Sequence, residues 1–271
     1  MKFGLTVNVN VPDATRLSRL AYETLKGQDL VLENEIANIL GKDGMRIEDM
    51  KVDVMVTIGG DGTVLRALMK NDAPIFGINA GDLGFLTEVQ EDMAEEGMER
   101  IIRGEYELDV RTKLRTDFAG RRMKDATNEV VVHTAHIAKL RHFRVYVDDE
   151  LAIDVRADGI IISTPTGSTC YAMSVGAPIL DPRVNALVLA PMAPFKFAGR
   201  PTVVPAKSDI RIEILRPKPC LIVLDGQEEA HMDGTEPLHF TTSDNKARFV
   251  SLGRTFYTKM REKLTGGTCW A

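Results

Sequence analysis

The first hundred residues alternate between strand-like and helix-like patterns of apolar positions. Three runs are predicted to form strands: KFGLTVNV (2–9), KVDVMVTI (51–58) and APIFGIN (73–79). Three segments between or after these strands have the apolar spacing of helices. They are the segment with Leu17, Leu20 and Leu25, then TVLRALMK (63–70) and EDMAEEGMERIIRG (91–104). Strands that alternate with helices predict a parallel sheet with helices on both faces.

The pattern changes near Glu105, and alternation with period two then dominates to about Leu252. Two alternating sets flank the turn DDE (148–150) and predict a hairpin: Phe143, Val145 and Val147 before it, and Leu151, Ile153 and Val155 after it. The same pattern recurs at Ile210, Ile212 and Ile214. We therefore expect a mostly β, sandwich-like second domain after the α/β domain.

These changes of pattern predict three segments. Residues 1–105 are expected to form the α/β domain, and residues 106–252 the β-rich domain. Residues 253–271 have some helical character, and we expect this segment to pack back on the first domain.

Composition narrows the function classes. The chain has 34 Lys and Arg against 39 Asp and Glu, so its net charge of −5 argues against a general nucleic-acid binder. No apolar run approaches the roughly 18 residues of a membrane span, and the N-terminus lacks the apolar stretch of a signal peptide. The three cysteines form no CxxC pair, and the five histidines have no metal-ligand spacing. We expect a soluble cytoplasmic protein without a membrane partner or a dedicated metal site.

Asp61 is a carboxylate within a glycine turn, VTIGGDGT (56–63), between a predicted strand and a helix. Such a turn favours an anion, yet the Walker motif and the dinucleotide fingerprint do not occur in the sequence. One hypothesis is a kinase, in which a carboxylate beside the phosphate accepts the proton of the acceptor hydroxyl. The alternative, equally favoured by this motif alone, is a tight turn in which Asp61 caps the next helix.

Further segments shift that balance. They are the second glycine loop GINAGDLGFLTE (77–88), NEVVV (128–132), the hydroxyl-rich ADGIIISTPTGSTCYAMSVGAPIL (157–180) and LDGQ (224–227). With GGDGT, these segments resemble the NAD kinase family over most of residues 55–227. The GGDGT turn alone is shared with diacylglycerol and sphingosine kinases, and similar turns occur in 6-phosphofructokinases. The TPTGST-x-Y segment and the GxLGFLT loop are more specific to NAD kinases.

The resemblance implies an enzyme that transfers the γ-phosphate of ATP, or a phosphate of polyphosphate, to the 2′-hydroxyl of the adenosine ribose of NAD, giving NADP. It implies that Asp61 acts on this hydroxyl and that Gly59, Gly60 and Gly62 line the phosphate path. It also implies a set of NAD contacts: Phe85 near the adenine, Asn128 and Glu129 near the adenosine, Asp158 near the nicotinamide of an NAD bound to a neighbouring subunit, the loop residues Thr166, Thr169, Tyr171 and Ser174, Ala193 at a partner-facing segment, and Asp225.

Two positions depart from the family pattern or vary within it. Cys170 stands in the binding segment where the family usually has alanine, which we expect to be tolerated because both are small. Arg66 is expected either to reach the donor phosphates or to lie on the helix surface. Magnesium is expected to come with ATP, and a homodimer or homotetramer is implied. A lipid or sugar kinase with the same turn, and a non-catalytic NAD(P)-binding regulator, remain the alternatives.

Overall fold

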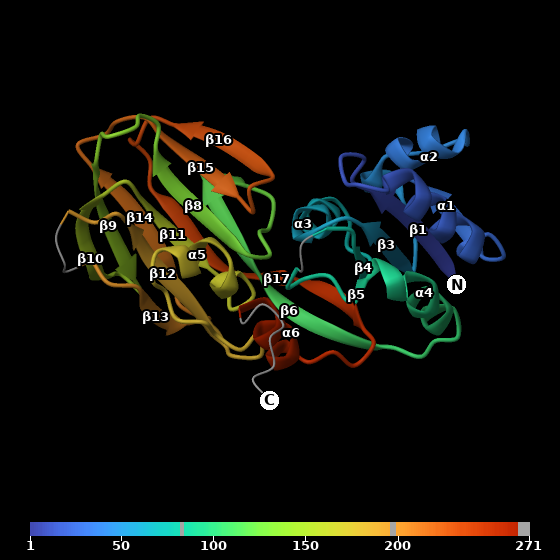
Figure 1. Ribbon diagram of the computed structural model, residues 1–271. Helices are drawn as coiled ribbons and strands as arrows, with labels where there is room; N and C mark the ends of the chain where they lie inside the picture. The colour runs from blue at the N-terminus through green and yellow to red at the C-terminus, as the bar shows by residue number, and fades with distance from the viewer. Residues whose placement is uncertain (82–83, 196–198, 265–271) are drawn as a thin grey trace. The chain divides into compact units, whose positions relative to one another are not determined.

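The computed structural model describes residues 1–81, 84–195 and 199–264 (Figure 1). Its chain divides into two compact units, Met1–Val110 with the residues from Ala247 onward, and Arg111–Lys246. Strands β6 (Glu107–Phe118) and β17 (Leu238–Ser251) contain the two boundaries, so each of them contributes residues to both units. The domain limits expected after residues 105 and 252 stay predictions.

The first unit is built on a parallel sheet with the strand order β4-β3-β1-β2 and the end of β17 beside β4. Its strands are β1 (Lys2–Val7), β2 (Asp29–Leu32), β3 (Val54–Ile58), β4 (Ile75–Asn79) and the short β5 (Val89–Gln90). All residues of β3 and β4 are buried, because helices cover both faces of the sheet. The three predicted strands are thus confirmed as β1, β3 and β4.

Helices α1 (Ala14–Leu25), α2 (Asn34–Leu40) and α4 (Ala94–Ile102) pack on one face, against alternate residues of β1 and β3 such as Leu5 and Val56. Helix α3 (Asp61–Lys70) and the 3₁₀ turn η1 (Ile47–Asp49) pack on the other face, where Met55 and Ile75 point. Figure 1 shows these two helical layers. The prediction of a parallel sheet covered on both faces is confirmed.

The second unit consists of antiparallel strands. One sheet has the order β13-β12-β11-β8-β15-β16, with these bounds: β8 (Glu129–Thr134), β11 (Gly159–Ser163), β12 (Ala186–Met192), β13 (Thr202–Pro205), β15 (Cys220–Leu224) and β16 (Glu228–Met232). The other strands are β9 (Arg141–Val147), β10 (Glu150–Ala157), β14 (Ile210–Leu215), the first part of β17, and the pair β6 and β7 (Arg121–Arg122). Strand β9 contacts β11, and β10 contacts β12, so two sheets face each other, as the sequence pattern predicts.

The predicted hairpin is confirmed as β9 and β10, with one difference on its second strand. The turn residues Asp148 and Asp149 both have positive φ, as a two-residue hairpin turn requires. A β-bulge between Leu151 and Ile153 inserts one extra residue into β10. Leu151 therefore lies 50% exposed, whereas Ile153 is buried, although the sequence spacing places both on one face.

The C-terminal helix α6 (Phe256–Leu264) belongs to the first unit. Lys259 of α6 donates hydrogen bonds within that unit to the carbonyl oxygen of Thr87 and to the carboxylate of Glu88. The rest of the segment for which packing on the first domain was expected, residues 265–271, lies outside the described residues. No helix among the described residues combines the length and the apolar composition needed to span a membrane.

Candidate active site

The glycine turn lies at the carboxyl end of β3, where Gly59 and Gly60 lead directly into α3. Gly60 is the N-cap of this helix, Asp61 is its first residue, and Gly62 follows in the first turn. The unpaired amide N–H groups at the start of a helix favour an anion such as a phosphate. The three glycines expected along the phosphate path therefore lie where the backbone can hold one.

The carboxylate of Asp61 does not cap α3. Its Oδ2 accepts a hydrogen bond from the amide of Phe85 at 2.8 Å, and its Oδ1 accepts one from the amide of Leu86 at 2.9 Å. The side chain is 20% exposed. A carboxylate has about four acceptor positions, so it can still accept a hydrogen bond from a substrate hydroxyl. The hypothesis that Asp61 caps the next helix is therefore wrong, because its carboxylate is bonded to the second glycine loop instead.

Gly84 makes this position of Asp61 possible. A Cβ atom on residue 84 would lie only 2.1 Å from Oδ1 of Asp61. The second glycine loop can therefore present two successive amides to the carboxylate because residue 84 has no side chain. The sequence singles out this loop, but not its contact with the first glycine turn.

Lys263 is a cation beside this carboxylate, and sequence reasoning missed it. Its Nζ is 3.8 Å from Oδ2 of Asp61 and 4.5 Å from the centre of the Phe85 ring. Phe85, expected near the adenine, is buried at this point. Lys263 lies far along the chain in a segment without a recognisable motif, so no local signal could have indicated it.

Arg66 on α3 lies in a network of polar contacts within the first unit. Its guanidinium donates to the carboxylates of Glu33 and Glu35 at 3.2 Å each, and to the carbonyl oxygen of Val7 at 2.9 Å. Burial raises the pKa of Glu33, while the hydroxyl of Thr6 and the charge of Arg66 oppose this rise. Arg66 is thus a half-buried partner of two carboxylates, and its expected contact with donor phosphates stays a prediction.

In the second unit, Asp225 joins two of the predicted segments. It follows β15, and its carboxylate accepts the amide N–H groups of Thr127, Asn128 and Glu129 at 2.6, 2.8 and 3.0 Å. These three consecutive amides form a concave anion site that the protein's own carboxylate fills. Asp225 therefore fixes the backbone of the NE pair, a role that sequence reasoning left undefined.

Glu129 is buried beside Asp225, and burial favours the protonated form of both carboxyl groups. Burial raises the pKa of Glu129 to about 8, and the charge of Asp225 acts in the same direction. Burial also raises the pKa of Asp225, to about 6, against the three amide hydrogen bonds and the charge of Lys113. Glu129 therefore keeps its proton to a higher pH than Asp225 does, and in its protonated form it can donate a hydrogen bond.

Three consecutive residues at this place carry buried polar atoms that no described residue satisfies. They are Oγ1 of Thr127, Oδ1 of Asn128 and Oε2 of Glu129. Buried polar groups in folded proteins are nearly always paired, so a cluster of unpaired ones points to a ligand. Their position supports the expected contact of Asn128 and Glu129 with a substrate.

The hydroxyl-rich loop after β11 packs against the same backbone. Oγ1 of Thr164 donates to the carbonyl oxygen of Thr127 at 2.6 Å, and a Cβ on Gly167 would meet the carbonyl oxygen of Asn128 at 2.2 Å. The Nδ2 of Asn128 donates to Sγ of Cys170 at 3.2 Å. The structure thus brings one group of predicted site residues to one end of the six-stranded sheet: Asn128, Glu129, Thr166, Thr169, Cys170, Tyr171, Ser174 and Asp225.

Within this group, the hydroxyls differ in exposure and in hydrogen bonding. Thr166 and Thr169 are buried, whereas Tyr171 is 44% exposed. The hydroxyls of Thr169 and Ser174 donate to the carbonyl oxygens of Thr166 and Tyr171, respectively. A hydroxyl that donates in this way can still accept a hydrogen bond from a ligand.

Asp158 and Ala193 are not part of that group. Gly159, next to Asp158, begins β11 and pairs with Met192, whereas Ser163, at the other end of β11, pairs with Glu129. The amide of Asp158 donates to the carbonyl oxygen of Met192, the neighbour of the exposed Ala193. The two residues therefore lie together at the opposite end of the sheet, five strand residues away.

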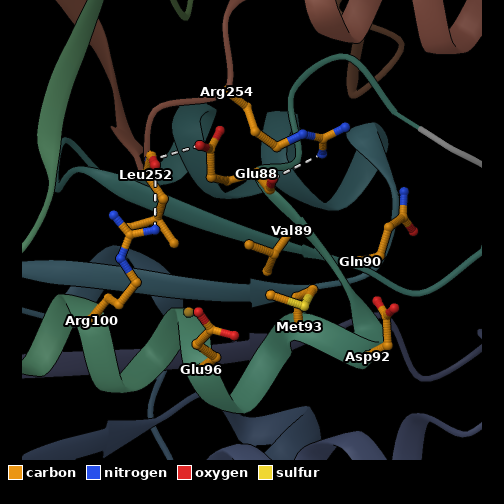
Figure 2. A pocket seen from close by; sticks show the side chains of 10 residues that line it. Glu88, Val89, Gln90, Asp92, Met93, Glu96, Arg100, Leu252 and Arg254 are labelled. Atoms are coloured by element: carbon orange, nitrogen blue, oxygen red, sulfur yellow. Dashed lines mark hydrogen bonds between the residues drawn. The ribbon is translucent and has the colours of Figure 1, made fainter.

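A cavity of about 300 Å³ in the first unit lies near the second glycine loop but contains none of the predicted site residues (Figure 2). Its walls come from β5, α4 and the segment after β17, and they include Glu88, Arg100 and Arg254. These three side chains form hydrogen bonds within the protein. Glu88 accepts the amide of Leu252, Arg100 donates to the carbonyl oxygen of Leu252, and Arg254 donates to the carbonyl oxygen of Glu88. Among the described residues, no three His, Cys, Asp or Glu side chains converge as metal ligands.

Known proteins match both units. The NAD kinase of Methanothermobacter thermautotrophicus is 41% identical over 98% of this chain and 97% of its own length. The NAD kinase of Thermococcus kodakarensis is 41% identical over 97% of this chain and 99% of its own. Among solved structures, an NAD kinase from Archaeoglobus fulgidus in complex with ATP is 28% identical, with a TM-score of 0.79 over 98% of both chains. A yeast NADH kinase complexed with NADH, 20% identical with a TM-score of 0.87 over 98% of this chain and 88% of its own, shares the fold.

A parallel sheet with a carboxylate in its glycine turn, and a β unit with a hydroxyl-rich loop, define the class of phosphotransferases with a GGDG turn. A family model described as the ATP-NAD kinase N-terminal domain matches residues 4–106, and one described as the ATP-NAD kinase C-terminal domain matches residues 127–252. The chain therefore belongs to the NAD kinase family and is an enzyme that phosphorylates NAD. A lipid kinase, a sugar kinase and a non-catalytic regulator are not favoured.

Proposed function

We propose that this enzyme transfers the γ-phosphate of ATP to the 2′-hydroxyl of the adenosine ribose of NAD, with Asp61 as the group that orients and deprotonates this hydroxyl. One observation carries the proposal: the carboxylate is held by two amides at the glycine turn, while part of it stays exposed. A carboxylate about 4 Å from a phosphate charge is repelled by about 4 kcal/mol at an effective dielectric constant of about 20. Its presence at a phosphate-binding turn is understandable if it accepts a proton there.

The donor is proposed to bind at the start of α3, with Gly59, Gly60 and Gly62 along its phosphates. ATP is favoured because the Archaeoglobus fulgidus relative is described in complex with ATP, and polyphosphate is the alternative donor. Magnesium would be held largely by the oxygens of the donor phosphates, and the carboxylate of Asp61 would be the protein group beside it. The ion would neutralise phosphate charge. Arg66 would reach the donor only by leaving Glu33 and Glu35.

NAD is proposed to contact the cluster at the end of the six-stranded sheet. The protonated Glu129 can donate a hydrogen bond and the Oδ1 of Asn128 can accept one, and both groups lack a partner among the described residues. The loop of Thr166, Thr169, Cys170, Tyr171 and Ser174 would supply further contacts, and Phe85 would contact the adenine. Asp225 would act through the backbone that it holds.

We also propose that Asp158 and Ala193 contact NAD bound to a neighbouring subunit. Asp158 and Ala193 lie at the end of β11 opposite to Glu129, and this separation supports a contact that is distinct from those of the other site residues. The assignment requires a homodimer or homotetramer, which light scattering after size-exclusion chromatography would detect. We further propose the domain limits 1–105 and 106–252, and a cytoplasmic location.

A coupled assay tests the proposed reaction. The protein is incubated with NAD, magnesium and either ATP or polyphosphate, and the product is offered to a glucose-6-phosphate dehydrogenase that requires NADP. Formation of NADP with ATP is the expected result. A lack of NADP with both donors, from protein that binds NAD, would contradict the proposal.

A further inference from the structure

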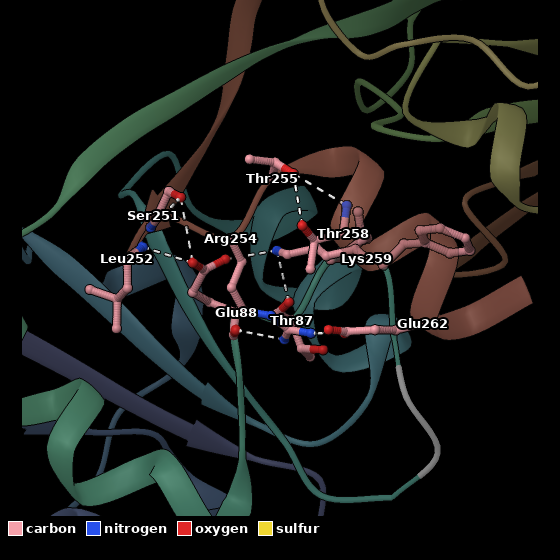
Figure 3. Close-up of polar contacts among 12 residues, drawn as sticks. Thr87, Glu88, Ser251, Leu252, Arg254, Thr255, Thr258, Lys259 and Glu262 are labelled. Atoms are coloured by element: carbon pink, nitrogen blue, oxygen red, sulfur yellow. Dashed lines mark hydrogen bonds and ion pairs between the residues drawn. The ribbon is translucent and has the colours of Figure 1, made fainter. Parts of the chain in front are cut away.

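Helix α6 is fixed to the second glycine loop by a buried ion pair (Figure 3). The Nζ of Lys259 donates to Oε2 of Glu88 at 2.7 Å and to the carbonyl oxygen of Thr87 at 3.0 Å. The side chains of Lys259 and Glu88 are only 8% and 4% exposed. The other carboxylate oxygen of Glu88 accepts the amide of Leu252, so both oxygens are used. The position of α6 is thus tied to the last residues of the loop that holds Asp61.

Lys263 lies on the same face of α6, because residues four apart in a helix are neighbours. Its ammonium reaches the carboxylate of Asp61, 3.8 Å away, and the face of the Phe85 ring. A distance of 3.8 Å is too long for a hydrogen bond, and the ammonium makes no hydrogen bond to any described residue. Its three N–H donors can therefore point to a substrate oxygen.

We propose that Lys263 is a catalytic residue whose ammonium contacts a non-bridging oxygen of the phosphoryl group during its transfer. The inference rests on the proposed function, which assigns the hydroxyl to Asp61 and the donor to the start of α3. A phosphate held there lies next to Asp61, the first residue of α3, and so next to the ammonium of Lys263. The ammonium offsets the repulsion between the carboxylate and the phosphate and stabilises the charge of the transition state.

In this reaction the bond between the ribose oxygen and the γ-phosphorus forms, while the bond between that phosphorus and the bridging oxygen of ADP breaks. The hydroxyl proton passes to Asp61, and the electron pair of the broken bond leaves with ADP. Lys263 keeps its proton throughout and only donates a hydrogen bond. The role is therefore electrostatic, and arginine should replace lysine in part.

The test compares Lys263→Met, Lys263→Arg and Arg261→Met, the last of which removes another exposed cation of α6 as a matched control. We expect Lys263→Met to lower kcat by about tenfold to a hundredfold with little change in the KM for NAD. Lys263→Arg should recover part of the loss, and Arg261→Met should behave like the wild type. A kcat within twofold of the wild type for Lys263→Met would overturn the inference, and so would an equal loss in Arg261→Met.

A binding measurement separates this inference from the proposed reaction. Isothermal titration with inorganic tripolyphosphate and magnesium needs no turnover, and we expect about tenfold weaker binding by Lys263→Met. If the wild type makes no NADP, the proposed function fails, and weaker tripolyphosphate binding still supports the phosphate contact. Equal tripolyphosphate binding by the wild type and Lys263→Met would overturn that contact.

Discussion

Asp61 in the first unit and Asp225 in the second are held in the same way but in different surroundings. Each lies in a glycine-containing turn at the end of a buried strand, and each accepts successive backbone amides, two for Asp61 and three for Asp225. Asp61 is 20% exposed and lies beside the ammonium of Lys263, whereas Asp225 is 6% exposed and is influenced by the carboxyl of Glu129 as well as by the charge of Lys113. Amides therefore position both carboxylates, and the exposure decides whether a carboxylate can react or only support the backbone.

The comparison predicts a large loss of turnover for Gly84→Ala, which moves Asp61 without changing its chemistry. The new Cβ would lie 2.1 Å from Oδ1, so the carboxylate or the loop must shift. A misplacement of about 1 Å costs about a hundredfold in rate, and we expect a loss of kcat of that order. Gly27→Ala is the control, because a Cβ there meets no atom within 4 Å. Normal turnover by Gly84→Ala would show that the position of Asp61 is not critical.

Asp225→Asn should reduce the stability of the fold, because the carboxylate of Asp225 holds the backbone of three consecutive residues. The oxygen of an asparagine can keep the two amides that Oδ1 accepts, but its NH2 group then faces the amide of Thr127, so buried N–H donors on both sides lack an acceptor. We expect the free energy of unfolding to fall by about 2 kcal/mol or more, measured by urea denaturation at pH 7. Asp233→Asn is the control, because this exposed carboxylate also accepts a backbone amide, that of Thr235. Removing its charge should hardly change the midpoint of urea denaturation. An equally small change of the midpoint in Asp225→Asn would show that Asp225 does not support the backbone, and the distinction between Asp61 and Asp225 would then fail.

The smallest effect is a pH dependence that arises from Glu129. Its pKa in the folded protein, about 8, is above its ordinary value of 4.5, so the folded state holds the proton more tightly than the unfolded state. This stabilisation is complete below about pH 4.5 and is lost as the pH rises through about 8. Between pH 5 and 8.5 the Tm of the wild type without ligand should fall by roughly 3 °C or more relative to Glu129→Gln. Parallel Tm curves for the two proteins would show that Glu129 is not protonated in the fold.

Local patterns in the sequence predict much of the fold, but contacts between distant residues set its details. The runs that become β1, β3 and β4 are recognisable because apolar residues occupy most of their positions and turn or helix signals follow them. Residues 29–40 form β2 and α2, which we did not predict, because both elements are short and β2 is only partly buried. The bulge that exposes Leu151 depends on pairing with β9 and has no signal in β10 alone.

The candidate site shows the same division. The glycine turn places Asp61 in the chain, but the amides of Phe85 and Leu86 and the ammonium of Lys263 reach it only in the folded unit. Similarly, the DG pair marks Asp225, while the three amides that it holds come from a segment nearly a hundred residues earlier in the chain. A motif thus identifies a reactive group, and the groups that position it require the structure.

The central claim is that Asp61 acts on the hydroxyl of NAD and contributes little to binding. The most direct measurement compares kcat and the Kd for NAD in Asp61→Asn and the wild type, from one preparation of each protein. We expect kcat to fall by about a hundredfold to ten-thousandfold, as for the loss of a general base, and the Kd for NAD to stay within about threefold. A kcat close to that of the wild type, from a folded variant that binds NAD normally, would contradict the account.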